Sequence, residues 1–381
     1  MRTATPIRPR RHLPWEEEVL PHLPAEIKSL LLATTQATRE QIEEIRLRSG
    51  QPLALGLQGQ EVFLNPEGKL TSEATEGYRV TLDQVAATWQ RMGRFSVYAL
   101  EEELRRGFLT LAGGHRVGLA GQFLQEEGRL KQVTSLNVRL AKELPGIAAL
   151  VLPYLVENGI VLNTMIVSPP QGGKTTLLRD LIRQISTGVR RLGLPGHKVG
   201  VVDERSELAG SMDGVPQLDL GPRTDVLDAS PKVEGLWLIL RSLSPQVIVT
   251  DELGGASEAA ALSDAARAGV RILATAHARD WSDLWGRNGT RLLSEEKIFQ
   301  RYVILGSSLG RGTVENIHDG EGVCLSAKPF RLRSENNEIA AGVLVGAGAA
   351  GGEELRRLLT QSESSIRGAF TQRGADFLCG N

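Results

Sequence analysis

The sequence predicts an α/β protein, in which a parallel sheet with helices on both faces is preceded by a smaller α+β domain. An apolar run at 161–167 is typical of a buried strand and is followed by a Gly-rich loop and an apolar-periodic helix. Three further β-rich runs, at 198–203, 247–250 and 270–275, end on polar residues. Shorter strand-like runs joined by Gly turns precede residue 146 and indicate the separate α+β domain.

Length and composition limit the class of protein. The 381 residues, 41% of them apolar, suit two or three domains with real cores. The formal net charge of −1 gives no overall attraction to nucleic acid. Cys324 and Cys379 lack metal-ligand spacing, so we expect a reducing cytoplasm and no disulfide scaffold. No apolar run approaches the roughly 20 residues of a membrane span.

We expect four regions along the chain. Residues 1–12 are basic and lack the apolar core of a secretory signal, so we expect a flexible tail. Residues 13–146 form the N-terminal α+β domain, and 147–327 form the main α/β domain. Residues 328–381 form a C-terminal extension that is partly helical or disordered, with an Ala- and Gly-rich stretch followed by a short helix at 353–370.

Turn residues divide the first domain into short elements. The pattern predicts helices near 15–20, 25–33, 81–92 and 101–106, strands at 42–48, 52–57 and 61–64, and a hairpin across Gly113-Gly114. Thr81 followed by Gln84 is a capping pattern for the third of these helices. A strand that begins at Asn137 leads to a short linker at Pro145-Gly146.

The segment 168–176 has the pattern of a phosphate-binding loop between a strand and a helix. Gly172 and Gly173 have no Cβ, so the backbone can curl and direct its N–H groups inward, and the helix start adds its positive dipole end. Lys174 can reach the β- and γ-phosphates, and the Thr175 hydroxyl can hold Mg²⁺. The predicted nucleotide-binding residues of the loop are Ser168, Pro169, Pro170, Gln171, Gly172, Gly173, Lys174, Thr175 and Thr176.

The loop departs from the usual pattern at Ser168, where Gly is expected. An alternative interpretation is a Gly-rich turn before an ordinary helix. The intact Gly173-Lys174-Thr175 core and the flanking strand and helix favour the phosphate-binding interpretation.

The run 247–250 ends on two carboxylates, Asp251 and Glu252. A nucleotide-hydrolysing site needs such a pair: Asp251 would hold Mg²⁺ opposite Thr175, and Glu252 would polarise the attacking water. A strand that ends in a solvated acidic turn is the alternative. In order after the Lys174 loop, the pair predicts a RecA-like P-loop ATPase core that uses ATP and Mg²⁺.

Two other strand ends carry polar residues, Glu204 with Glu207 after one strand and His277 after the other. In open α/β sheets ligands bind outside the carboxyl ends of the strands, so these side chains are expected to converge with Lys174 and Asp251. His277 could sense the γ-phosphate through a hydrogen bond that exists only before hydrolysis; a polar surface histidine is the alternative.

The chain resembles the stage III sporulation protein AA family over roughly residues 40–320. The segments that carry the resemblance are Glu44-Ile-Arg-Leu-Arg-Ser-Gly50, Gly113-Gly-His-Arg-Val-Gly-Leu119, Asn137-Val-Arg-Leu-Ala141, Ser168-Pro-Pro-Gln-Gly-Gly-Lys-Thr-Thr-Leu-Leu-Arg-Asp180, Val201-Val-Asp-Glu-Arg-Ser-Glu-Leu208, Arg223-Thr-Asp-Val-Leu-Asp228, Arg241-Ser-Leu-Ser-Pro-Gln-Val-Ile-Val-Thr-Asp-Glu252 and Thr275-Ala-His277. The core is also similar to the hexameric ATPases of type II and type IV secretion.

The resemblance implies an acidic box at Asp203, Glu204 and Glu207, an arginine motif at Arg241 with Pro245, and a histidine box at His277. It also implies a hexameric ring ATPase on the cytoplasmic face of a membrane, on the mother-cell side. That ring would drive a channel of membrane-embedded sporulation proteins between mother cell and forespore. The sequence departs from the expected pattern where Gln171-Gly172 replaces Gly-Cys, and in some fifty additional C-terminal residues.

Hydrolysis needs positive charge around the leaving phosphates, and in ring ATPases a neighbouring subunit often supplies an arginine. The candidates are Arg223, Arg241, Arg139 and Arg116. Arg241 is favoured by its place in the secretion-like motif. Arg139 could reach the site from the first domain, which in secretion ATPases closes over the nucleotide. Arg116 is expected to be an ordinary surface or ion-paired residue.

Two other functions are compatible with the motifs. A nucleic-acid-dependent P-loop ATPase is opposed by the balanced charge and the 4% aromatic content, so we expect no nucleic-acid partner. A nucleotide-gated assembly scaffold without significant turnover is opposed by the intact Asp251-Glu252 pair.

Overall fold

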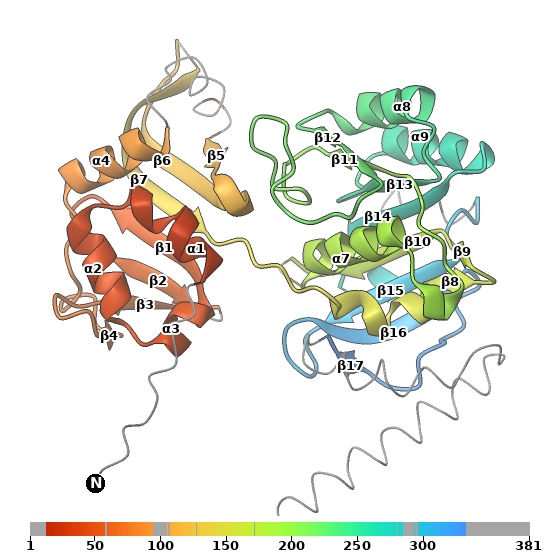
Figure 1. Cartoon of the computed structure of the whole chain (residues 1–381), viewed down its shortest axis with the longest axis horizontal. Helices are drawn as coiled ribbons and strands as arrows, with labels where there is room; N and C mark the ends of the chain where they lie inside the picture. Colours follow the sequence, from red (N-terminus) through yellow and green to blue (C-terminus); the bar gives the residue numbers. More distant parts are fainter. Residues whose placement is uncertain are drawn as a thin grey trace, which may run out of the picture. The chain divides into compact units, whose positions relative to one another are not determined.

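The computed structural model describes residues 13–332 apart from 58, 94–104, 106, 127, 171, 280, 285–292 and 294–295. The expected tail at 1–12, the extension beyond 332 and nearly all of the expected helix at 101–106 lie outside the described residues. The chain forms two compact units (Figure 1). The first comprises the described residues up to Lys142 and the segment Gly210–Leu218. The second comprises Glu143–Ala209 and the described residues from Asp219 onward.

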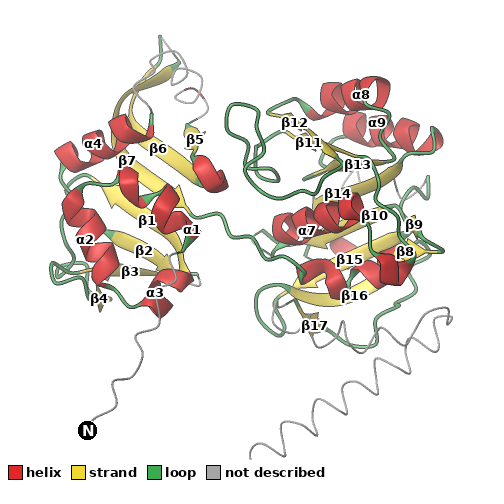
Figure 2. Ribbon diagram, in the orientation of Figure 1, coloured by secondary structure: helices red, strands yellow, loops and turns green. Residues whose placement is uncertain are grey.

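The first unit is a sheet in the order β4-β3-β2-β1-β7-β6-β5 with helices packed on it (Figure 2). Each strand pairs with its neighbours in antiparallel fashion. The strands are β1 Ile42–Arg48, β2 Ala54–Leu57, β3 Gln60–Leu64, β4 Leu70–Thr71, β5 Phe108–Thr110, β6 Arg116–Leu124 and β7 Arg129–Arg139; the helices are α1 Pro14–Glu18, η1 Leu20–His22, α2 Ala25–Ala33, α3 Gln36–Gln41, α4 Leu82–Met92 and η2 Ala112–Gly114.

Local sequence signals account for these elements. The Thr81 hydroxyl accepts from the N–H of Gln84, and the Gln84 side chain accepts from the N–H of Thr81, which confirms the predicted cap of α4. The hairpin expected across Gly113-Gly114 is confirmed by the pairing of β5 with β6. Both glycines have positive φ, 76° and 75°, a conformation that costs residues with a Cβ additional free energy.

The second unit contains a sheet in the order β12-β11-β13-β14-β10-β15-β16-β17. The first six strands in this order run parallel, β16 pairs antiparallel with β15, and β17 pairs antiparallel with β16. The strands are β10 Thr164–Ser168, β11 Val199–Asp203, β12 Thr224–Asp228, β13 Val247–Thr250, β14 Arg271–His277, β15 Arg301–Gly306, β16 Thr313–Asp319 and β17 Phe330–Arg331, with a small hairpin of β8 Val156–Glu157 and β9 Ile160–Val161.

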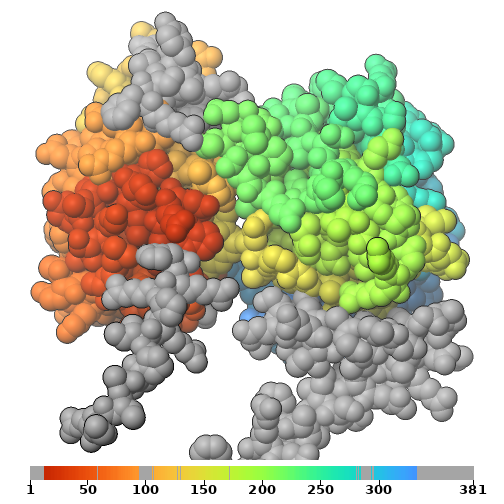
Figure 3. Space-filling model, in the orientation of Figure 1, coloured from red at the N-terminus to blue at the C-terminus, as the bar shows by residue number. Residues whose placement is uncertain are grey.

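Helices cover both faces of this sheet, as predicted. The longer helices are α7 Lys174–Thr187, α8 Lys232–Ser242 and α9 Ala256–Arg267; the shorter ones are η3 Ile147–Leu150, α6 Leu152–Leu155, η4 Arg190–Leu192 and α10 Trp281–Leu284. Ile166 of β10 faces the core that contains the apolar side chains of α7, whereas its neighbours Met165 and Val167 face the core shared with α8 and α9. In the space-filling view, side chains fill the spaces between the ribbons of each unit (Figure 3).

The strand expected at 161–167 is divided. Val161 pairs with Val156 in the β8–β9 hairpin, and β10 begins only at Thr164. Asn163 separates the two because its side chain accepts from the N–H of Ile272 at 3.0 Å and donates to the carbonyl of Ile298 at 3.0 Å. Among the described residues, no helix has both the length and the apolarity needed to cross a bilayer.

Candidate functional site

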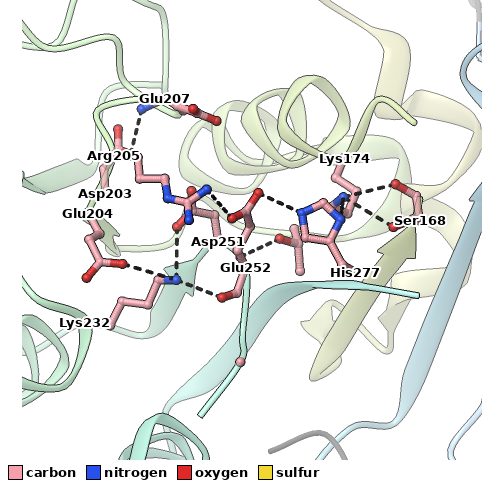
Figure 4. A network of polar contacts seen from close by, with 12 residues as sticks. Ser168, Lys174, Asp203, Glu204, Arg205, Glu207, Lys232, Asp251, Glu252 and His277 are labelled. Carbon is pink, nitrogen blue, oxygen red and sulfur yellow. Dashed lines mark hydrogen bonds and ion pairs between the residues drawn. The ribbon is translucent and has the colours of Figure 1, made fainter. Parts of the chain in front are cut away.

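Four neighbouring parallel strands of the second unit bring their carboxyl ends to one edge of the sheet. Ser168 ends β10 and lies opposite His277, the last residue of β14, in the strand register. Asp203 ends β11, and Asp251 directly follows β13. The predicted convergence of these strand ends on Lys174 is therefore present in the structure (Figure 4).

The loop between β10 and α7 depends on two glycines. A Cβ on Gly172 would lie 2.5 Å from Ser168 Oγ, and Gly173 has a φ of 97° at the position before the helix. Within the described chain, no side chain caps the start of α7. The first N–H groups of a helix have no partner inside it, so the start of α7 can receive an anion. Gln171 of this loop lies outside the described residues.

Lys174 lies at the centre of the site and is 6% exposed. Its Nζ donates to the main-chain carbonyl oxygens of Ser168 at 3.4 Å and Pro169 at 3.5 Å. It also donates to Ser168 Oγ at 3.2 Å and to His277 Nδ1 at 3.1 Å. Burial lowers the pKa of Lys174, and the charge of Glu252 acts against that change. Among the described residues, the ammonium thus has only neutral hydrogen-bond acceptors, and phosphate oxygens can replace them.

His277 connects Lys174 with Glu252. Because the ammonium of Lys174 can only donate, His277 Nδ1 accepts and its Nε2–H donates to Glu252 Oε1 at 2.9 Å. Glu252 Oε2 forms an ion pair with Arg205 at 2.5 Å. Burial alone would raise the pKa of Glu252, but the hydrogen bond from His277 and the charge of Arg205 outweigh burial and lower this pKa.

The backbone of Glu252 is held as firmly as its carboxylate. Its φ is 42°, in the left-handed region that disfavours residues with a Cβ. Its N–H donates to Thr275 Oγ1 at 2.8 Å, and its carbonyl accepts from Lys232 Nζ at 2.8 Å. These contacts keep the carboxylate turned toward His277 (Figure 4).

Asp251 has the features of a metal ligand. It is 4% exposed, and within the described part of the chain its Oδ1 has no hydrogen-bond partner. Burial raises its pKa to about 7, while the charge of Lys232, 3.9 Å away, acts to lower it. A buried carboxylate oxygen without a hydrogen bond suits a hard cation such as Mg²⁺.

The second predicted ligand, Thr175, is half-buried in the first turn of α7. The described residues contain no group of three or more His, Cys, Asp or Glu side chains that could hold a metal by themselves. A Mg²⁺ ion at Thr175 and Asp251 would therefore take most of its ligands from water and phosphate, as Mg²⁺ commonly does.

The acidic loop begins directly after Asp203, the last residue of β11, and carries Glu204 and Glu207. Asp203 accepts from the N–H groups of Glu207 at 2.9 Å, Leu208 at 3.0 Å and Ala209 at 2.8 Å. Burial raises the pKa of Asp203 to about 6 despite these bonds. The Glu204 carboxylate lies 3.5 Å from Lys232 Nζ. Asp203 thus fixes the loop that carries Glu204 and Glu207.

Two of the predicted arginines, Arg223 and Arg241, belong to the second unit and contact groups other than Lys174. Arg223 precedes β12 and donates to the carbonyl of Ser186 near the end of α7, roughly 18 Å along the helix from Lys174. Arg241 is in the last turn of α8, with its guanidinium 5.2 Å from the ring centre of Trp237.

The other two arginines belong to the first unit. Arg139 forms an ion pair with Glu44 at 3.1 Å, and Arg116 packs over the ring of Phe108 at 3.7 Å. A contribution of Arg139, or of Arg241 from another subunit, stays a prediction.

Sequence reasoning missed three basic residues around the site. Arg205 lies between Glu204 and Glu207 in the sequence, and this position in the acidic motif could have indicated that it belongs to the site. Arg179 of α7 donates to the carbonyls of Leu208 at 2.8 Å and Glu207 at 2.9 Å. Lys232 begins a helix that follows a different strand, and no sequence pattern connects it with Asp251.

This parallel sheet, with a lysine-bearing loop after one strand and two carboxylates after another, has a RecA-like fold, with a smaller unit before it. The X-ray structure of the Legionella pneumophila ATPase DotB shares the fold with a TM-score of 0.51 and 13% sequence identity, over 93% of this chain and 89% of that one.

The sequence model of the family described as "Sporulation stage III, protein AA" matches residues 15–325. Stage III sporulation protein AA of Bacillus subtilis (strain 168) is 43% identical over 312 residues, which cover 81% of this chain and 97% of that protein. The chain therefore belongs to this sporulation family. Protein SEEDLING PLASTID DEVELOPMENT 1 of Arabidopsis thaliana is 30% identical over 151 residues, 39% of this chain and 21% of that protein.

Proposed function

We propose that this protein binds and hydrolyses ATP with Mg²⁺. The observation that carries the proposal is the continuous contact path Lys174–His277–Glu252 beside the buried Asp251. Such a path joins a phosphate-binding lysine to a carboxylate that can orient water, which a simple nucleotide-binding scaffold does not need.

Each residue has a role that follows from its contacts. The N–H groups at the start of α7 receive the β- and γ-phosphates, and Lys174 exchanges the Ser168 carbonyl for their oxygens. Thr175 and Asp251 hold Mg²⁺, which neutralises charge on the phosphates. Glu252, whose pKa is lowered by the hydrogen bond from His277 and the charge of Arg205, orients the attacking water. His277 loses its contact with Lys174 when the γ-phosphate is present and keeps this contact when the γ-phosphate is absent.

We further propose that the active form is a hexameric ring on the cytoplasmic face of a membrane, coupled to a channel between mother cell and forespore. Membership of the sporulation family supports this setting. Among the described residues of the second unit, Arg223 contacts Ser186 and Arg241 contacts Trp237, and this favours an arginine supplied in trans, which a ring would provide.

The central test is ATP turnover by purified protein with Mg²⁺. Lys174→Ala removes the only lysine in the phosphate-binding loop, and we expect hydrolysis to fall by about 10²-fold or more. Lys198→Ala, an exposed lysine before β11, is the matched control and should retain the normal rate. A normal rate for Lys174→Ala would show that the site assignment is wrong.

A further inference from the structure

Lys232 occupies a position that is unfavourable for a lysine. It is the first residue of α8, where the helix dipole favours acidic side chains, and it is 6% exposed. Burying an ammonium is costly unless charged and hydrogen-bonding partners offset the loss of water. A specific set of partners must therefore hold Lys232 at this place.

The partners of Lys232 are the acidic residues of the candidate site. Its Nζ donates to the main-chain carbonyl of Glu252 at 2.8 Å and lies 3.5 Å from Glu204 Oε2 and 3.9 Å from Asp251 Oδ1. Figure 4 shows the ammonium between Glu204 and the backbone of Glu252, on the side opposite His277. Lys232 thus contacts the backbone of the proposed catalytic carboxylate and leaves its side chain free to face His277.

The contact matters because the backbone of Glu252 is strained. A residue with a Cβ is less stable in the left-handed region than in the right-handed region, and φ at Glu252 is 42°. The conformation persists where surrounding contacts impose it. Two hydrogen bonds do so, one from the N–H of Glu252 to Thr275 and one from Lys232 to its carbonyl.

We propose that Lys232 is a positioning residue for ATP hydrolysis, which holds Glu252 in its left-handed conformation and so keeps the carboxylate beside His277. The proposal rests on the proposed ATPase function. It assigns Lys232 no contact with nucleotide, since Lys174 and the start of α7 supply those contacts. At saturating Mg²⁺, loss of Lys232 should therefore lower kcat and leave the KM for ATP unchanged.

The test replaces Lys232 by methionine, which keeps the apolar stem and removes the donor and the charge. We expect kcat to fall by about 10²-fold, the size of a lost general-base contribution. Lys198→Met makes the same chemical change at an exposed position outside the acidic cluster and should retain the normal kcat. A normal kcat for Lys232→Met would overturn the proposal.

A double-mutant cycle separates positioning from general loss of stability. If Lys232 acts through Glu252, the Lys232→Met/Glu252→Gln protein should turn over no more slowly than Glu252→Gln alone. Additive losses would mean that Lys232 acts elsewhere. Lys232→Arg, which keeps a charged donor, should recover part of the rate. If Lys232→Met does not fold, the rates of Lys232→Arg and Lys232→Gln are compared instead, and the Lys232→Arg protein should have the higher rate.

A crystal structure of a Lys232 variant tests the role of this lysine without an activity assay. In a crystal structure of nucleotide-free Lys232→Met, φ of Glu252 should become negative and its carboxylate should leave His277. An unchanged Glu252 would refute the inference even if the wild-type protein hydrolyses ATP. Conversely, a wild-type protein without turnover would refute the proposed function, while the conformation of Glu252 would still decide the role of Lys232.

Discussion

Ser168 and Gly172 share one small space in the loop before α7. A Cβ on residue 172 would lie 2.5 Å from Ser168 Oγ and 2.8 Å from Ser168 Cβ, well inside normal contact distance. The serine that departs from the phosphate-binding pattern is therefore accommodated because residue 172 has no side chain. The sequence contains both residues, but it does not indicate that they are neighbours in space.

Asp251 leads to a prediction about stability and pH. Burial raises its pKa from 3.8 to about 7, so between these values the folded protein holds a proton that the unfolded chain releases. The contribution of Asp251 to stability is therefore fully present below pH 4 and is lost as the pH rises through 7. Without metal or nucleotide, Asp251→Asn should unfold with a free energy higher than wild type by on the order of 2–4 kcal/mol at pH 8.

The measurement is urea unfolding with EDTA at pH 5 and pH 8. The excess stability of Asp251→Asn should shrink toward pH 5, and the variant should lose Mg²⁺-dependent hydrolysis. Asp225→Asn, an exposed residue of β12, is the control and should show no such difference. An Asp251→Asn protein less stable than wild type at pH 8 would contradict the explanation by burial.

At the scale of elements, Asp180 connects α7 to the segment that begins the second unit. Its carboxylate is 4% exposed and accepts from the N–H groups of Gly146 at 3.1 Å and Ala148 at 2.8 Å. It also accepts from Gln184 Nε2 at 2.7 Å. The helix that carries Lys174 is thus joined directly to the start of η3.

Removing this carboxylate should be costly, because it leaves buried N–H groups without acceptors. We expect Asp180→Ala to lower the free energy of unfolding by about 2–4 kcal/mol. Asp264→Ala, on the exposed side of α9, should change stability by less than about 1 kcal/mol. Chemical denaturation of both variants at pH 7.5 measures the difference; equal stabilities would show that the Asp180 contacts contribute little.

Several elements of the core follow from the sequence because buried parallel strands are continuous apolar runs. The runs at β11, β13 and β14 and the loop before α7 carry both the strand signal and the polar residues that end each strand, so the edge of the sheet with Lys174 and Asp251 is predictable. Side-chain contacts between elements that are distant in the sequence cannot be predicted in this way. Lys232 and Arg205 contact Glu252 only once α8 and the acidic loop have packed, and Asn163 interrupts a strand through bonds to two other segments.

At the scale of the whole molecule, assembly is the main prediction. The backbone of Arg241 lies about 13 Å along the axis of α8 from that of Lys232, and its guanidinium packs on Trp237. Arg241 therefore does not contact the site of its own chain. If it acts on a neighbouring subunit, ATP with Mg²⁺ should convert the 41.3 kDa protein into a particle of six times that mass. Sedimentation with and without nucleotide measures this, and an unchanged monomer would contradict the ring.

Mixing variants provides the control for this prediction. Lys174→Ala and Arg241→Ala should each be inactive alone. When they are mixed, some interfaces join an intact Lys174 site to an intact Arg241, so part of the activity should return. Failure of the mixture to recover any hydrolysis, despite ring formation, would show that Arg241 does not act between subunits.

The segment Gly210–Leu218 belongs to the first unit although the residues on both sides of it belong to the second. A Cβ on Gly114 would lie 3.0 Å from Leu218, so this excursion is packed into the first unit rather than lying loosely on it. A truncated fragment of the second unit must therefore be designed with this segment in mind. A fragment that starts at Glu143 would carry the segment 210–218 without the unit it packs on, and the apolar Leu218 would be exposed to solvent. Insolubility of that fragment would not show whether the second unit can fold alone. Replacing 210–218 by a short Gly-Ser linker in that fragment removes the exposed segment, so the solubility of the new fragment reports on the folding of the second unit itself.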